Sequence, residues 1–223
     1  MPDTVLNEPL PCPGPRPVEL RAADLRLLRR ADALVRDEQS HPEQRVKLRI
    51  DDYLRLSEAG AFDRYARTEL IDGVVYAMNT QHRPHGFAKD ELAYRLRRAL
   101  EAMGSYLHVA TEQSVAMAPH DQPEPDIILT TEPRGSGPIP GRSVALLVEI
   151  AHTSLDHDLF RKAPVYAERG VAEYWVVDVK AGLIHQMWSP QGEEYVERQG
   201  VKLGERIEAA TIEGLAVETD GLA

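Results

Sequence analysis

The hydrophobic pattern of the chain is organised around one continuous apolar run, V-A-L-L-V-E-I-A, at residues 144–151. The run is too short for a stable helix, so it predicts a buried strand. Glu149 lies inside it. Burying a lone ionised carboxylate is costly even after its surroundings relax. We therefore expect a compensating group beside Glu149, and a bound cation is one candidate.

The segment after this run has helical periodicity, with apolar positions at Leu159, Ala163 and Tyr166. Lys162 lies three residues from the first of these positions and four before the last. Its side chain is therefore expected on their inward face. Two interpretations stay open at this point, namely a buried Glu149–Lys162 ion pair and a functional site at the sheet.

Helical periodicity and one turn signal dominate the first half of the chain. Residues 1–17 are dense in proline and predict an extended tail. Asp72-Gly73 between two short apolar runs predicts a hairpin, and Gly104 ends a helix. The predicted elements are an amphipathic helix at 18–37, a short helix at 50–60, the hairpin at 68–79, and a helix at 84–103 with an apolar stripe of Phe87, Leu92, Leu96 and Leu100.

Short apolar runs in the second half predict strands at 105–117 (one strand or a bent pair), 124–130, 143–151, 173–179, 183–188 and 193–197. If the strand at 124–130 pairs antiparallel with the one at 143–151, Asp126 lies across from Glu149. Pro164 either kinks the intervening helix or is its first residue, with Lys162 before it. The order of elements predicts an α/β fold (α+β in its mixed sheet), with helices flanking a central mixed sheet.

Composition narrows the class of protein. A chain of 223 residues with 43% hydrophobic residues favours one medium-sized folded domain. The net charge of -10 argues against a surface built for general nucleic-acid binding, but it leaves room for a local basic groove. A single cysteine, Cys12, excludes an intrachain disulfide framework and a cysteine-based zinc site. Without a signal-peptide pattern or a long apolar run, a soluble cytoplasmic protein is expected.

Other candidate groups carry weaker signals. The densest basic surface is the back of the helix at 84–103, with Lys89, Arg95, Arg97 and Arg98. His82 and His85 share a helix face without a third zinc ligand at a recognisable spacing, and His85 equally fits the wall of a phosphate-binding cleft. Asp156 and Asp158 are interpreted as helix caps. Neither G-x-x-x-x-G-K-[ST] nor G-x-G-x-x-G occurs, so no nucleotide cofactor is expected.

Four motifs occur in a fixed order: T-E-L-I-D-G at 68–73, E-P-D at 124–126, V-E-I-A at 148–151, and K-A-P-V-Y-A-E-R-G-V-A-E-Y-W-V-V-D at 162–178. In this combination the chain resembles the Uma-two family of bacterial endonucleases, within the PD-(D/E)XK nuclease superfamily. The resemblance covers about residues 50–218, and the run from 148 to 178 makes it specific. It implies a nuclease domain at 50–223 behind an N-terminal extension at 1–49.

The resemblance also implies a restriction-endonuclease-like fold and phosphodiester hydrolysis that depends on Mg²⁺ (or Mn²⁺). By motif, Glu69, Asp126 and Glu149 are the expected catalytic carboxylates. Position 151 is Ala, where the superfamily pattern has Lys. Lys162 matches the place from which a lysine of the following helix is expected to take that role.

Coordination chemistry agrees with this implication. Mg²⁺ prefers oxygen ligands, usually one or two carboxylates together with waters and substrate phosphate oxygens. Asp126 and Glu149, with the Ile150 carbonyl nearby, would supply such oxygens as metal ligands. The ion would also offset the burial of Glu149. Lys162 would then serve either as a base towards the attacking water or as an electrostatic stabiliser.

Two functions follow from these observations. The first is a Mg²⁺-dependent DNA endonuclease, and the alternative is a non-catalytic DNA-binding or regulatory protein that keeps the nuclease fold. In either case His85, Lys89 and Arg95 are candidate contacts to phosphate or DNA. A homodimer is expected, because one site per chain makes double-strand cuts most simply in a two-fold dimer. Its interface is expected at the helix at 20–34 or at the strand edge near 183–197.

Overall fold

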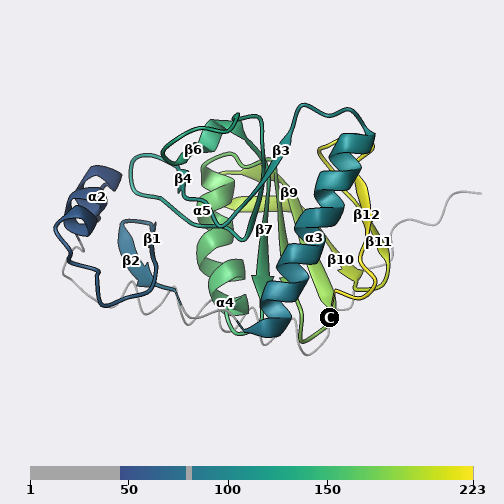
Figure 1. Cartoon of the computed structure of the whole chain (residues 1–223), viewed down its shortest axis with the longest axis horizontal. Helices are drawn as coiled ribbons and strands as arrows, with labels where there is room; N and C mark the ends of the chain where they lie inside the picture. The colour runs from purple at the N-terminus through teal and green to yellow at the C-terminus, as the bar shows by residue number, and fades with distance from the viewer. Residues whose placement is uncertain (1–45, 79–81, 223) are drawn as a thin grey trace, which may run out of the picture. The chain divides into compact units, whose positions relative to one another are not determined.

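The computed structural model of the chain describes residues 46–78 and 82–222 (Figure 1). These residues belong to the second of two compact units, Arg45–Ala223, and the fold below is that unit's own. The predicted proline-rich tail at 1–17 and the predicted amphipathic helix at 18–37 lie outside the described residues.

A six-stranded mixed sheet forms the centre of the described unit, in the order β10-β9-β8-β7-β5-β3. Its strands are β3 (His108–Thr111), β5 (Ile127–Thr130), β7 (Val144–Ala151), β8 (Glu173–Asp178), β9 (Leu183–Gln191) and β10 (Glu194–Lys202). Only the β7–β8 pair is parallel, and the other neighbours run antiparallel. The predicted mixed α/β sheet is confirmed.

Helices and short hairpins surround this sheet. They are α2 (Ile50–Glu58), α3 (Arg83–Ala102), the 3-10 turn η1 (Gly141–Ser143), α4 (Leu155–His157), the π-helical turn η2 (Asp158–Lys162), α5 (Ala163–Glu168), and the strand pairs β1 (Thr68–Ile71) with β2 (Val74–Ala77), β4 (Val115–Ala116) with β6 (Ile139–Pro140), and β11 (Arg206–Glu208) with β12 (Ala216–Glu218). The predicted strand at 105–117 is therefore a bent pair, because β4 leaves the main sheet to pair with β6.

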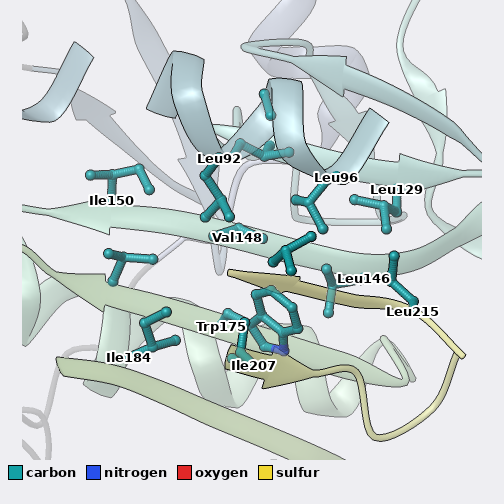
Figure 2. Packing of buried hydrophobic residues seen from close by; sticks show 14 of the residues in the cluster. Leu92, Leu96, Leu129, Leu146, Val148, Ile150, Trp175, Ile184, Ile207 and Leu215 are labelled. Atoms are coloured by element: carbon teal, nitrogen blue, oxygen red, sulfur yellow. The ribbon is translucent and has the colours of Figure 1, made fainter. Parts of the chain in front are cut away.

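The two faces of the sheet are buried by different elements, and β7 contributes alternate residues to each. Its residues Leu146, Val148 and Ile150 belong to the hydrophobic cluster beneath α3 and the β11–β12 hairpin. Figure 2 shows this cluster, with Leu92 and Leu96 of α3 above the sheet strands. The intervening β7 residues share the other face with α5. Because side chains alternate along a strand, Glu149 lies on the α5 face.

One residue of the predicted α3 stripe is misplaced. Phe87 is 62% exposed, whereas Ala88, Leu92 and Leu96 are fully buried. Leu92 lies five positions after Phe87. At 3.6 residues per turn, five positions place the two side chains about 140° apart around the helix axis. Phe87 is expected in the core because it is apolar, but its angular position on the helix turns its side chain away from the buried face.

The predicted turn at Asp72-Gly73 is confirmed between β1 and β2. Both residues have positive φ, 50° and 73°, as a two-residue hairpin turn of the primed type requires. A Cβ on Gly73 would also lie 2.7 Å from the Cα of Lys47. Leu70 exchanges both backbone hydrogen bonds with Gln122 (3.2 and 2.8 Å), which docks the hairpin on the segment before β5.

The chain around Pro164 follows neither of the two predicted alternatives in full. A π-helical turn, Asp158–Lys162, precedes α5, and Pro164 occupies one of the first two positions of that helix. Pro164 has no N–H and its ring crowds the carbonyl four residues earlier, so the wider π turn relieves a clash that an α-helix would retain. Lys162 ends the π turn and is 3% exposed.

Candidate active site

The pairing of β5 with β7 brings two distant carboxylates together. Ile127 is paired with Val148, so the antiparallel register places Asp126 beside Glu149. Asp126 Oδ2 accepts a 2.8 Å hydrogen bond from the Ile150 N–H and lies 3.1 Å from His85 Nε2. The N–H and C=O of one strand residue point to the same side, so the Ile150 carbonyl also faces the β5 edge of β7.

Lys162 lies between two buried carboxylates. Its Nζ is 2.9 Å from Glu69 Oε2 and 2.9 Å from Glu149 Oε1. Tyr166, one helical turn further on, donates its hydroxyl to the same Glu149 oxygen at 3.1 Å. The predicted helical face is therefore present, and the structure brings together Glu69, Glu149 and Lys162.

The charges of this cluster shift the pKa values of its members in opposite directions. Burial raises the pKa of Glu149 well above its ordinary value; Lys162 opposes this shift, and the charge of Asp158 adds to it. Burial also raises the pKa of Asp158. For Glu69 burial acts in the same direction, but Lys162 and His157 outweigh it and lower the pKa to about 2.

The shift at Lys162 follows from its neighbours. Burial alone would lower the pKa of this ammonium, but Glu149, Glu69 and Asp158 together raise it above its ordinary value. The side chain therefore stays protonated throughout the neutral range. A protonated amine can donate hydrogen bonds and stabilise negative charge, but it cannot accept a proton from water.

A pocket of about 320 Å³ opens on this cluster. Its walls include Arg67 and four of the chain's eight histidines: His82, His85, His152 and His157. The Nδ1 atoms of His85 and His152 are buried and have no hydrogen-bond partner among the described residues. The histidine side chains that line the pocket can hydrogen-bond to a ligand that carries donors or to a group bound to a metal ion.

The carboxylates fit a hard divalent cation in part. Each of these side chains is held through one oxygen, Oδ2 of Asp126 and Oε1 of Glu149. The second oxygen of each, Asp126 Oδ1 and Glu149 Oε2, meets no protein donor among residues 46–78 and 82–222. Within these residues no group of three or more His, Cys, Asp or Glu side chains converges on one point. Two carboxylate oxygens completed by waters and phosphate oxygens are a common Mg²⁺ environment.

Two of the three predicted phosphate contacts are used inside the protein. Lys89 is 6% exposed and its Nζ lies 2.9 Å from Glu112. Arg95 binds Glu91 at 2.8 Å and donates to the Glu218 carbonyl at 2.8 Å, which ties α3 to β12. Both side chains therefore have protein partners and only His85 of the three lines the pocket, and a contact of Lys89 or Arg95 with phosphate stays a prediction.

Sequence patterns missed four residues of the site. Tyr166 fitted a purely apolar pattern, yet its hydroxyl binds Glu149. Asp158 was interpreted as a cap, but it begins the π turn, is 3% exposed and accepts from Ser154 Oγ at 2.7 Å. His157 lies 3.4 Å from Glu69, and Arg67 lines the pocket. For His157 and Asp158 the polar stretch before Lys162 was the only sequence signal, and Arg67 had none.

Comparison with known proteins places the chain in a family. Residues 50–220 match the profile of the Uma2 family, whose description is "Putative restriction endonuclease". The match spans most of the chain, and the chain therefore belongs to this family. A search of curated proteins found no match.

Among solved structures, the fold is similar to a crystal structure described as "a putative nuclease belonging to DUF820" from Anabaena variabilis, with a TM-score of 0.60 and 15% sequence identity. The similarity covers 78% of this chain and 97% of the other. The restriction-endonuclease-like fold expected from the motifs is thereby confirmed. Within the described residues, no helix is both long and apolar enough to cross a membrane.

Proposed function

We propose that this protein is a DNA endonuclease that hydrolyses phosphodiester bonds with a bound Mg²⁺ or Mn²⁺ ion. The observation that carries the proposal is the pair of adjacent carboxylates, Asp126 and Glu149, each with one oxygen that meets no donor among the described residues; Lys162 binds the other oxygen of Glu149. Membership of the Uma2 family and the described nuclease with the same fold support the same activity.

Each residue of the site would have its own role in the hydrolysis. Asp126 and Glu149 would hold the ion, with the Ile150 carbonyl as a further oxygen. Such an ion lowers the pKa of a bound water and polarises a phosphate. Lys162 would stabilise the negative charge that develops on the phosphate, since its raised pKa keeps it protonated. His85 would orient Asp126, because its Nε2 lies 3.1 Å from Asp126 Oδ2.

A second candidate function is a binding or regulatory protein that retains the nuclease fold without catalysis. One observation favours it: the Glu69–Lys162–Glu149 ion pairs give Lys162 two carboxylate partners without any ligand. Such a protein would bind DNA or a partner without a divalent ion. Metal binding therefore separates the two candidates.

The test is plasmid nicking in Mg²⁺ or Mn²⁺ combined with calorimetric metal titration. Wild type should bind the ion and nick the plasmid, and Asp126→Asn should do neither while keeping its fold. Glu208→Gln is the matched control, since Glu208 is an exposed carboxylate on β11. If wild type binds no divalent ion, the endonuclease proposal fails and the binding protein is favoured.

The assembly and surroundings of the enzyme belong to the same proposal. The substrate is DNA, the location is the cytoplasm, no nucleotide cofactor takes part, and two chains form a homodimer. Of the strand edge proposed near residues 183–197, β9 is paired on both sides, whereas β10, which begins at Glu194, has a free edge in the main sheet of the described residues. The edge strands of the sheet are β10 and β3. Sedimentation equilibrium tests the dimer, and a monomer at high concentration would refute it.

A further inference from the structure

The three carboxylates expected from the motifs, Glu69, Asp126 and Glu149, all line the pocket, but the protein uses their oxygens differently. Asp126 and Glu149 are each held through one oxygen, and their second oxygen meets no donor among the described residues. Glu69 has both oxygens engaged. Its Oε2 lies 2.9 Å from Lys162 Nζ and accepts from the Glu124 N–H at 3.3 Å, and its Oε1 lies 3.4 Å from His157 Nε2.

From this difference we infer that Glu69 is a positioning residue for Lys162 and not a ligand of the metal ion. Among these three carboxylates, Asp126 and Glu149 each have an oxygen that meets no donor among the described residues, so we assign these two to the ion. This inference rests on the proposed nuclease function, and it assigns to Glu69 a role different from the one that the motif resemblance implied.

The charges explain why Lys162 needs a second partner. A divalent cation on Glu149 repels the ammonium that binds the other oxygen of the same carboxylate. A lysine with Glu149 as its only partner would then be pushed towards solvent. Glu69 supplies a second counter-charge, also 2.9 Å from Nζ. The ammonium has three N–H donors, so one remains for a phosphate oxygen after both carboxylates are bound.

The position of Glu69 in the fold suits this role. It lies on β1, and the adjacent Leu70 exchanges both backbone hydrogen bonds with Gln122. Glu69 itself is 3% exposed. A residue held on a docked hairpin keeps its geometry when a ligand binds, which is what a positioning group requires. Asp126, by contrast, immediately precedes β5, and the register of β5 with β7 places it opposite Glu149 in the main sheet.

The experiment is a Mn²⁺ titration by calorimetry in the absence of DNA, run beside plasmid nicking on the same preparations. The variants are Glu69→Gln, Asp126→Asn and Glu149→Gln, with Glu208→Gln as the matched exposed control. We expect Glu69→Gln to bind Mn²⁺ like wild type while its nicking rate falls by on the order of 10²–10³. The other two site variants should lose Mn²⁺ binding.

Loss of Mn²⁺ binding in Glu69→Gln, comparable to that in Asp126→Asn, would overturn the inference and leave the nuclease function standing. Wild-type nicking by Glu69→Gln would overturn it as well. Failure of the nuclease function looks different, because then wild type itself binds no ion or nicks no plasmid.

A double variant separates positioning from direct action and guards against misfolding. Glu69→Gln combined with Lys162→Met removes a buried charge pair together, so this protein is expected to fold and to bind Mn²⁺. If Glu69 acts through Lys162, the double variant nicks no more slowly than Lys162→Met alone. A further loss of rate, or a loss of Mn²⁺ binding in the double variant, would contradict the positioning role.

Discussion

Glu149 and Glu173 lie in neighbouring parallel strands of the same sheet and are almost equally buried, at 4% and 0% exposure. Their surroundings differ. Glu149 accepts from Lys162 and Tyr166 through one oxygen and faces further carboxylates. Glu173 accepts from five neutral donors: Trp175 Nε1 and Gln186 Nε2 at 2.6 Å, the Ala210 N–H at 3.0 Å, and the Thr211 N–H and Oγ1 at 2.8 and 2.9 Å.

The comparison separates a structural buried carboxylate from one available for chemistry. The donors of Glu173 use both of its oxygens, so nothing remains for a ligand, and its bonds to Ala210 and Thr211 pin the segment between β11 and β12 to the sheet. Glu149 keeps one oxygen unused and opens on a pocket. A buried carboxylate with too few donors is costly in the free protein, and this cost favours binding of a cation.

The largest effect is expected at Lys162, the ammonium that Glu69 and Glu149 share. Without a divalent ion, Lys162→Met should lower the free energy of unfolding by about 3–5 kcal/mol, since it leaves buried carboxylates uncompensated. Saturating Mg²⁺ should restore most of that stability but not nicking, which should fall on the order of 10²–10³. Chemical denaturation and plasmid nicking measure the two effects.

Lys180→Met is the control for this variant, because Lys180 lies in the turn after β8, away from the pocket. Its stability should stay within about 0.5 kcal/mol of wild type, as is usual for surface changes. Nicking by Lys162→Met at the wild-type rate in Mg²⁺ would reduce Lys162 to an ion-pair partner and remove it from the reaction.

Paired Glu→Gln substitutions test the comparison directly. Glu173→Gln places an amide N–H₂ against donors and should cost about 3 kcal/mol of stability, while the folded fraction keeps its nicking rate. Glu149→Gln should cost less stability, because burial already raises the pKa of this carboxyl and glutamine resembles its protonated form. It should abolish nicking. The reverse pattern in urea unfolding and nicking would show that the two roles are misassigned.

A smaller effect concerns metal removal. At a Mn²⁺ concentration of about 100 times Kd, wild type should be stabilised by about 2.7 kcal/mol relative to the same protein in chelator. Glu173→Gln should show the same gain, and Glu149→Gln should show none. Thermal unfolding with and without chelator measures this. An equal gain in both variants would mean that the ion binds elsewhere.

The smallest effect is a pH dependence at Glu69. Its pKa is lowered from the ordinary 4.5 to about 2 in the folded protein. Its stabilising contribution is therefore complete above about pH 4.5 and is lost as the pH falls towards 2. In chelator, Glu69→Gln should be less stable than wild type at pH 6, and the difference should shrink by pH 3. A constant difference in urea unfolding across that range would exclude the Glu69–Lys162 linkage.

Local sequence patterns were sufficient to predict the secondary-structure elements around the site and the chemical character of the site. The apolar run with Glu149 inside it, the helical spacing of Lys162 and the Asp72-Gly73 turn predicted a strand, a helix and a hairpin that the structure contains. Such patterns are readable because side-chain periodicity depends only on neighbouring residues. The sequence also predicted that antiparallel pairing of the strands at 124–130 and 143–151 would place Asp126 across from Glu149.

The role of each buried charged side chain depends on its tertiary contacts. The runs V-A-L-L-V-E-I-A and E-Y-W-V-V-D both place a glutamate in an apolar strand, and nothing local distinguishes Glu149 from Glu173. Apart from Trp175 in the same strand, the donors of Glu173 come from β9 and from the segment after β11, and the ammonium beside Glu149 comes from η2. Lys89 likewise became an internal ion-pair partner because Glu112 faces α3. Which donors meet a buried carboxylate depends on packing between distant segments, and side-chain periodicity carries no record of that packing.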